Sequence, residues 1–259
     1  MVRREKSNYV IHSVSHALDV LEQFPGSGDE IGVTELSKRL KLHKNNVFRL
    51  LATLEARGYI EQNRATENYR LGLRCLQLGQ AYVGQIGFLH QAKSTLQSLA
   101  EETHESAFVS LRKGMGVVPL DFVESRSPVR VASFLGETLP LYCTAPGKVH
   151  LAFGSEEELR HGIPENLTRY TDKTIVDRQA LLRQIQHVSE EGYALDLGEF
   201  IEDVACVAVP VRDYTRGLVG CLSVTGPGHR LNRERMEKEV IPLTLKGGSE
   251  LSRRLGYHQ

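Results

Sequence analysis

The 259-residue chain has little cysteine and no tryptophan. Its four cysteines, at positions 75, 143, 206 and 221, show no Cys-x-x-Cys spacing, which argues against a zinc ribbon or a thioredoxin-like redox centre. Scattered cysteines in a chain that lacks a signal peptide are expected to be reduced packing residues. No motif places a histidine near Cys206, so a nucleophilic role for it has little support. A structural metal held by a Cys/His pair stays open.

Net charge and long apolar runs are also missing. Thirty-two basic residues balance 32 acidic ones, so the chain is not a generic polyanion binder. No apolar run approaches ~18 residues, and the N-terminus does not resemble a signal peptide. These absences predict a cytoplasmic protein without a membrane partner.

Motifs of common catalytic and cofactor sites are absent as well. The ten histidines form no His-Glu-x-x-His pattern, and His150 is expected to be a packing or surface residue. Gly147-Lys148 lacks the earlier glycine and the Ser/Thr of a phosphate-binding loop, while Gly26 and Gly28 follow a helix and not a strand. We therefore assign no catalytic residue, cofactor or metal ligand.

The clearest positive feature is a pair of short amphipathic helices joined by a three-residue turn. The first, at residues 33–40, places Leu36 and Leu40 on one face, with Thr34 as its expected N-cap. The second begins at Lys44 and is expected to end at Gly58. Its apolar residues recur at i, i+3, i+4 and i+7: Val47, Leu50, Leu51 and Leu54. A plain helical hairpin with a solvated basic face fits this periodicity as well as a helix-turn-helix does.

The flanking segments favour a winged helix-turn-helix. Residues 59–62 and 69–71 read as two short strands around a polar turn, which predicts a β-hairpin wing. Upstream, a third helix is predicted from a stripe of apolar residues: Val14, Ala17, Leu18 and Leu21. Residues 25–28 then break the chain.

Charge supports a DNA interface at this end of the chain. Residues 36–74 carry nine basic and three acidic residues, a net charge of +6, and residues 2–6 add a basic arm. The outer face of the second helix and the wing supply the groups that would meet base edges and phosphates. The DNA-binding candidates are Thr34, Lys44, Asn45, Asn46, Arg49, Arg64 and Arg70.

Eight stretches, taken in order, resemble the IclR (isocitrate lyase regulator) family of bacterial transcription factors. They are residues 13–21 (SVSHALDVL), 33–40 (VTELSKRL), 47–59 (VFRLLATLEARGY), 69–78 (YRLGLRCLQL), 139–152 (LPLYCTAPGKVHLA), 192–199 (GYALDLGE), 206–211 (CVAVPV) and 220–226 (GCLSVTG). The resemblance implies an α+β protein with an N-terminal winged helix-turn-helix (residues 1–72), a linker helix (73–87) and a C-terminal effector-binding domain (88–259). The last domain would be GAF/profilin-like, and the protein a dimer or tetramer.

The pattern of the second half is compatible with an α+β domain. Helices are predicted at residues 73–85, 89–100 and 177–191, the last with Leu181, Leu182, Ile185 and Val188 inward, and a final helix begins near Asn232 and is bent or interrupted by Pro242. Strands are predicted at residues 107–111, 117–123, 129–134, 193–197, 204–211 and 218–224.

The loop at residues 143–148, which enters a helix, is the expected effector site. Free amides at a helix N-terminus favour a carboxylate. In IclR-like domains this loop helps to bind the ligand together with several strand residues. Asp196 would accept a hydrogen bond from a ligand hydroxyl. Ser223 and Thr225, which lie on one face of their strand, would donate hydrogen bonds to a ligand carboxylate. The effector-binding candidates are Thr144, Ala145, Pro146, Gly147, Asp196, Val204, Cys206, Ser223 and Thr225.

Three positions depart from the family pattern. Pro146 replaces a small residue with an N–H group, which removes one amide donor. Lys41 stands at a turn position that is often glycine, and Asn46 where a hydroxyl residue is common. The identity of the effector and the operator sequence are therefore not transferable from the resemblance.

We expect a transcriptional regulator, most simply a repressor, that binds double-stranded DNA at a palindromic operator as a homo-oligomer. A small organic acid in the C-terminal domain would control that binding. Two alternatives remain: an architectural DNA-binding protein whose second domain only dimerises, and an enzyme whose C-terminal domain turns over its ligand.

Overall fold

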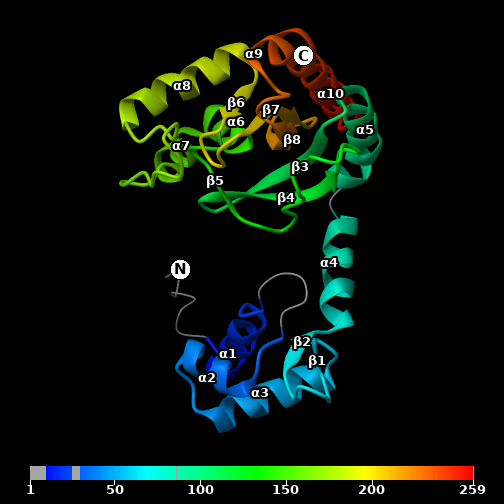
Figure 1. Ribbon diagram of the computed structural model, residues 1–259, viewed down its shortest axis with the longest axis vertical. Helices are drawn as coiled ribbons and strands as arrows, with labels where there is room; N and C mark the ends of the chain where they lie inside the picture. The colour runs from blue at the N-terminus through cyan, green and yellow to red at the C-terminus, as the bar shows by residue number, and fades with distance from the viewer. Residues whose placement is uncertain (1–9, 25–29, 86, 259) are drawn as a thin grey trace, which may run out of the picture. The chain divides into compact units, whose positions relative to one another are not determined.

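The computed structural model describes residues 10–24, 30–85 and 87–258, and the chain divides into two compact units, residues 1–85 and 86–259 (Figure 1). The predicted basic arm at residues 2–6 and the break at residues 25–28 lie outside the described residues. The first unit comprises α1 (His12–Leu21), α2 (Val33–Leu40), α3 (Lys44–Ala56), β1 (Ile60–Gln62), β2 (Tyr69–Leu71) and α4 (Leu73–Gln85).

The core of the first unit lies between its three N-terminal helices and the wing. The stripe predicted for α3 is confirmed, because Val47, Leu51 and Leu54 are buried and Leu50 is partly buried. The stripe predicted for α1 is partly wrong. Val14 and Leu18 are more than half exposed, and α1 instead packs through its buried residue Val20 and the partly buried Ala17 and Leu21.

The two ends of α2 contain one wrong assignment and one departure from the family pattern. Thr34 does not cap α2: the helix begins at Val33, with the carbonyl of Gly32 accepting from the Leu36 amide at 3.1 Å. Lys41 ends α2 in the left-handed conformation, at φ 53°, where glycine is ordinarily favoured. Gly58, at φ 73°, ends α3 as predicted.

The predicted wing is confirmed as an antiparallel hairpin in which Ile60 pairs with Leu71 and Gln62 with Tyr69. Glu30 fixes its turn from outside, accepting from the side chains of Asn63 at 2.7 Å and Thr66 at 2.6 Å.

The second unit is built on one antiparallel sheet with the strand order β5-β4-β3-β8-β7-β6. Its strands are β3 (Ser106–Lys113), β4 (Gly116–Val123), β5 (Leu139–Pro140), β6 (Ala194–Leu197), β7 (Val204–Arg212) and β8 (Leu218–Pro227). Its helices are α5 (Gly87–Thr103), α6 (Ala145–Phe153), α7 (Glu156–Gly162), α8 (Arg178–Glu191), α9 (Arg233–Arg235) and α10 (Ile241–Arg254), with a π-helical turn η2 (Met236–Val240) before α10.

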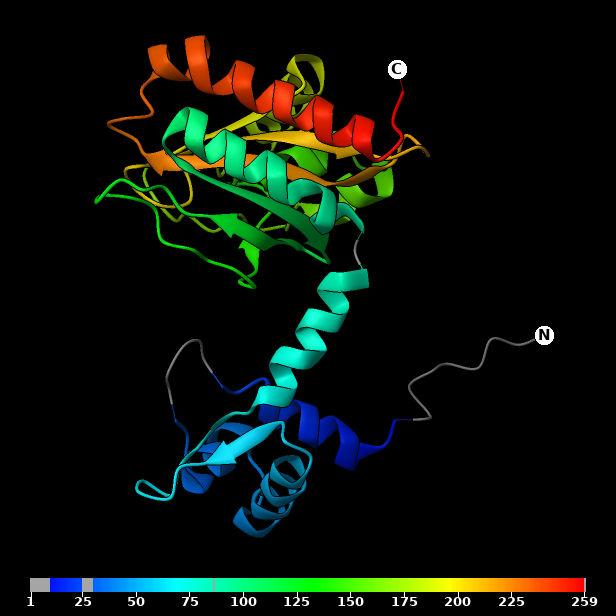
Figure 2. The ribbon, with the colours of Figure 1, turned by 90° about the vertical axis from the view of Figure 1, so that its right-hand side faces the viewer.

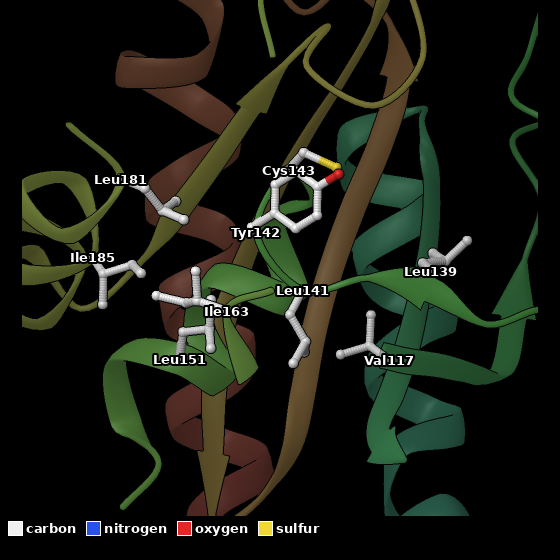
Figure 3. Close-up of a cluster of buried hydrophobic side chains, with 9 residues drawn as sticks. All are labelled: Val117, Leu139, Leu141, Tyr142, Cys143, Leu151, Ile163, Leu181 and Ile185. Carbon is white, nitrogen blue, oxygen red and sulfur yellow. The ribbon is translucent and has the colours of Figure 1, made fainter. Parts of the chain in front are cut away.

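Helices cover both faces of this sheet. Helices α5 and α10 lie alongside each other on one face, where they contact β3, β4, β7 and β8 (Figure 2). Helix α6 packs on the other face against β6, β7 and β8, and α8 packs on α6. The layer on the α6 side buries a cluster of apolar residues from β4, β5, α6 and α8 and the loops between them (Figure 3). The site described below lies next to this layer.

Three details of the second unit differ from the prediction or refine it. Residues 129–134 form no strand; they run as an irregular segment, and Val129 is 61% exposed. Leu182 does not point inward and is 39% exposed. The last helix is interrupted as predicted, by the π-helical turn that precedes Pro242.

Candidate functional site

The N-terminal half of α3 presents the predicted polar surface. Lys44, Asn45, Asn46 and Arg49 are all exposed, while the opposite face of the helix is buried in the core. His43 precedes the helix, and its ring nitrogen accepts from the Asn45 amide at 3.4 Å. This arrangement leaves four hydrogen-bonding side chains free to approach a DNA groove.

The wing places its two arginines differently. Arg64 is exposed at the hairpin turn. Arg70 lies across the hairpin from Glu61, with Nη2 of the arginine 3.2 Å from the carboxylate. Both groups of this pair are at least half exposed, so its net contribution to stability is small and a phosphate can compete for Arg70. Thr34 is also exposed, in the first turn of α2.

A cavity in the second unit lies between the sheet, the N-terminus of α6 and the segments 131–139 and 196–204. It holds about 500 Å³ of empty space, its open mouth included. Apolar side chains make up most of the wall, among them Phe108, Phe134 and Phe200. The irregular segment at residues 129–134, for which the sequence predicts a strand, supplies Val131 and Phe134 to this wall.

Seven of the nine effector candidates line this cavity: Thr144, Ala145, Pro146, Asp196, Val204, Cys206 and Thr225. Gly147 and Ser223 are absent from the lining. A Cβ at Gly147 would come within 2.2 Å of the Leu141 carbonyl oxygen, so this glycine serves a close backbone contact. Ser223 is fully buried in the sheet between Phe108 and Ala208, and its hydroxyl has no hydrogen-bond partner among the described residues.

The α6 N-terminus offers fewer amides than the sequence suggested. Thr144 caps the helix, and its hydroxyl accepts from the Gly147 amide at 3.2 Å while donating to the Pro140 carbonyl at 2.6 Å. Pro146 has no N–H group. The Ala145 amide is thus left without an acceptor in the part of the chain that the structure describes.

Asp196 supplies a buried carboxyl group to the cavity. Its Oδ1 accepts from the amides of Gly198 at 3.1 Å and Glu199 at 2.7 Å, which fixes the turn after β6. Burial raises the pKa of this carboxyl to about 6 in spite of those hydrogen bonds. The lining also contains Glu137 and no Lys, Arg or His, so the charged side chains that it offers to a ligand are acidic.

A buried ion pair, which the sequence analysis missed, lies directly behind Asp196. Lys148 on α6 is fully buried; its Nζ contacts Glu199 Oε1 and donates to the Leu195 carbonyl at 3.0 Å. The carbonyl of Glu199 accepts from the Thr174 hydroxyl at 2.6 Å, so the turn at residues 196–199 is braced from both sides. The pair joins the α6 N-terminus to the turn that carries Asp196.

The buried cysteine thiols and His150 are not arranged as a nucleophile and a base among the described residues. Burial raises the pKa of the Cys206 thiol well above its usual value and that of Cys143 to about 12, so both stay protonated. His150 is packed in the interior, as one of the two alternatives for it predicted, and burial lowers its pKa to about 4. In the described ranges no group of three or more His, Cys, Asp or Glu side chains is placed to hold a metal ion.

No helix within the described ranges combines the length and the apolar character that a bilayer span requires.

Comparison with known proteins matches both units. The family model described as IclR helix-turn-helix domain matches residues 13–64, and the one described as Bacterial transcriptional regulator IclR C-terminal matches residues 80–253. The HTH-type transcriptional regulator XynR of Escherichia coli (strain K12) is 33% identical over 249 residues, which cover 96% of this chain and 98% of XynR. KdgR of the same organism is 33% identical over 250 residues, covering 95% and 94%.

Solved structures share the whole architecture. The structure of Thermotoga maritima IclR is 26% identical, covers 95% of this chain and 99% of its own, and matches with a TM-score of 0.78. An IclR homolog from Microbacterium hydrocarbonoxydans, complexed with 4-hydroxybenzoate, matches with a TM-score of 0.84 at 19% identity, covering 94% of this chain and 99% of its own.

Proposed function

Because this chain belongs to the IclR family of bacterial transcriptional regulators, we propose that it represses transcription by binding an operator. It dissociates from the operator when a small organic acid enters the cavity. Its relatives are transcriptional regulators, which sets the enzymatic alternative aside. One observation carries the proposal: a winged helix with an exposed polar recognition face and a lined cavity occur in separate units of one chain.

The operator is a palindrome read by a dimer, with one α3 helix in each half-site. Support comes from apolar residues that the first unit leaves exposed. On α1, Val14 and Leu18 lie on one helical face and are 55% and 54% exposed; on α4, Leu73 and Leu76 are 62% and 58% exposed. A second copy of the chain would cover such faces, and a monomeric protein gains nothing from them. The same contact between copies sets the spacing of the two recognition helices.

The effector binds in the cavity with its carboxylate at the Ala145 amide. The Thr225 hydroxyl, which donates to the Ala205 carbonyl at 3.2 Å, exchanges that bond for one to the carboxylate, and the hydroxyl of the effector donates a hydrogen bond to Asp196. The 4-hydroxybenzoate bound by the Microbacterium homolog is an acid of this chemistry, with both groups on an apolar ring. In this chain the aromatic and aliphatic wall would bury the body of such a ligand. Binding there favours one dimer geometry over another and so changes the spacing of the recognition helices.

The test combines one variant in each unit. Arg49→Ala should lower operator affinity at least tenfold, since it removes a charge and hydrogen-bond donors from the exposed face of α3. The same variant should keep the thermal stabilisation that an organic acid gives the wild type in a screen of candidate acids. Operator binding would be measured by gel shift and ligand binding by thermal shift. Unchanged operator affinity in Arg49→Ala would refute the role assigned to this residue.

A second variant tests the cavity. Asp196→Ala should respond less to the acid identified in the screen, with operator affinity in the absence of ligand left as in the wild type. A normal response would remove the cavity from the proposal. Failure of every acid to stabilise the wild type would favour the architectural alternative, in which the second unit only dimerises.

A further inference from the structure

Phe48 differs from the other large apolar side chains of α3. It is 57% exposed, whereas Val47, Leu51 and Leu54 are buried and Leu50 is partly buried. More than half of the surface of Phe48 is therefore left outside the core of its own unit. The neighbouring polar residues are DNA-binding candidates on sequence grounds, and Phe48 is not among them.

The position of Phe48 on the helix is informative. Residues three and four apart share a face, so Phe48 lies one turn from Lys44 and Ala52 and beside Asn45. All of these residues are exposed, as is the adjacent Arg49. The ring is therefore a single apolar contact inside the polar and basic surface of the recognition helix, and the small side chain of Ala52 leaves room for a groove to approach it closely.

We propose that Phe48 reads the 5-methyl group of a thymine in each operator half-site. This inference rests on the proposed function, because it assumes that α3 enters the major groove. Of the groups that base pairs present there, the thymine methyl is the apolar one, and apolar side chains including Phe recognise it by contact.

The charge of the surroundings selects DNA over a protein partner. Lys44 and Arg49 flank the ring, and residues 36–74 carry a net charge of +6. A docking surface for a protein would present a contiguous apolar patch, and on this face Phe48 is surrounded by amide and basic side chains. A duplex satisfies both features, since its phosphates neutralise the charge while a methyl group covers the ring.

Replacement of thymine by uracil tests the contact without changing any hydrogen bond of the base pair. The operator is first obtained by selection from a random duplex library with the full-length wild-type protein. Each dT of the selected operator is then replaced by dU, and the affinities of the wild type and Phe48→Ala are measured by fluorescence anisotropy at one fixed salt concentration. Burial of one methyl group corresponds to a factor of about four in affinity.

The expected result is a double-mutant cycle with coupling at one position per half-site. At that position each dT-to-dU replacement lowers the operator affinity of the wild type about fourfold, whereas Phe48→Ala binds the dT and dU operators equally. At every other position the two proteins show the same ratio of dT to dU affinity. Phe48→Leu should retain part of the discrimination. Met115→Ala, which removes a 51% exposed apolar side chain from the second unit, should match the wild type at every position.

Two results would overturn the inference: equal dT/dU ratios for the wild type and Phe48→Ala throughout the operator, or a uniform loss of affinity for all duplexes in the variant. Either would make the ring a general or a protein-binding contact. If the wild type selected no sequence at all, the DNA-reading function itself would fail, and this outcome is distinct from both.

Discussion

Lys148 and Glu199 keep two opposite charges away from water behind the cavity, with 0% and 9% of their side chains exposed. A buried pair of this kind adds little net stability, but removing one partner leaves the other charge unpaired. The pair could not be predicted, because lysine is ordinarily an exposed residue and its partner lies 51 positions away. Asp196, by contrast, could be assigned to the cavity through the family resemblance.

Lys148→Met should destabilise the second unit by about 3–5 kcal/mol, measured by urea unfolding, because it strands the Glu199 carboxylate in the interior. The double variant Lys148→Met/Glu199→Gln should recover part of this loss. Lys238→Met is the matched control: its pair with Glu234, at 2.8 Å, is 75% exposed on both sides and should cost less than about 0.5 kcal/mol. A loss below 1 kcal/mol for Lys148→Met would contradict the structural role of the pair.

Affinity for an acid effector should increase as the pH falls from 8 to 5. The pKa of Asp196 is raised by burial to about 6, so its carboxyl becomes neutral over this window. The carboxylate of the effector is then no longer repelled by Asp196, while the neutral carboxyl of Asp196 can still accept a hydrogen bond from the hydroxyl of the effector. We expect affinity for the effector to increase by up to about tenfold. The folded state also favours the protonated form of Asp196, because the pKa of this residue is higher in the folded than in the unfolded chain. Asp196 therefore contributes more to the free energy of unfolding at pH 5 than at pH 8.

Asp196→Asn is the control for this pH dependence. It should bind the acid at pH 8 about as tightly as the wild type does at pH 5, with little change between the two, in isothermal titration calorimetry. The pKa of Glu199 is also raised by burial, so Glu199→Gln should be measured beside it. An unaltered pH profile in Asp196→Asn would assign the titration to another group.

Among the helices and strands, hydrophobic periodicity correctly predicted those elements that bury one continuous apolar face. It failed where an element has more than one apolar face or where a segment pairs with no strand. The stripes of α3 and α5 were predictable, because the apolar residues spaced three and four apart in each helix pack on one core. The stripe of α1 was wrong at Val14 and Leu18, since apolar residues lie on more than one face of this short helix and sequence alone does not say which face the unit itself covers. Residues 129–134 have strand-like composition, but they line the cavity and pair with no neighbouring strand.

The uncovered faces of α1 and α4 lead to a prediction about assembly. Leu18→Glu and Leu76→Glu should each lower affinity for the full palindrome at least tenfold and leave affinity for a single half-site unchanged, because they separate the two winged helices without altering either one. Leu182→Glu, at a 39% exposed position of α8, serves as the matched control. Equal losses on the full site and the half-site would argue against a dimer contact through these helices.

At the scale of the whole molecule, two units with different surfaces account for a two-part function. The first presents hydrogen-bonding side chains on α3 and a wing, and the second encloses a cavity with an apolar wall and a titratable carboxyl. Sequence motifs in order indicated the family, and the family models match both units. What they could not give is the part of the cavity lining that comes from the irregular segment, or the buried ion pair behind Asp196, which forms over a long chain separation.

Control of DNA binding by the cavity is tested most directly by the operator affinity of the full-length wild type with and without a saturating acid effector, measured by fluorescence anisotropy. We predict that the effector lowers operator affinity at least tenfold, and that Asp196→Ala shows a smaller change at the same effector concentration. An acid that stabilises the protein on heating but leaves operator affinity unchanged would contradict this prediction.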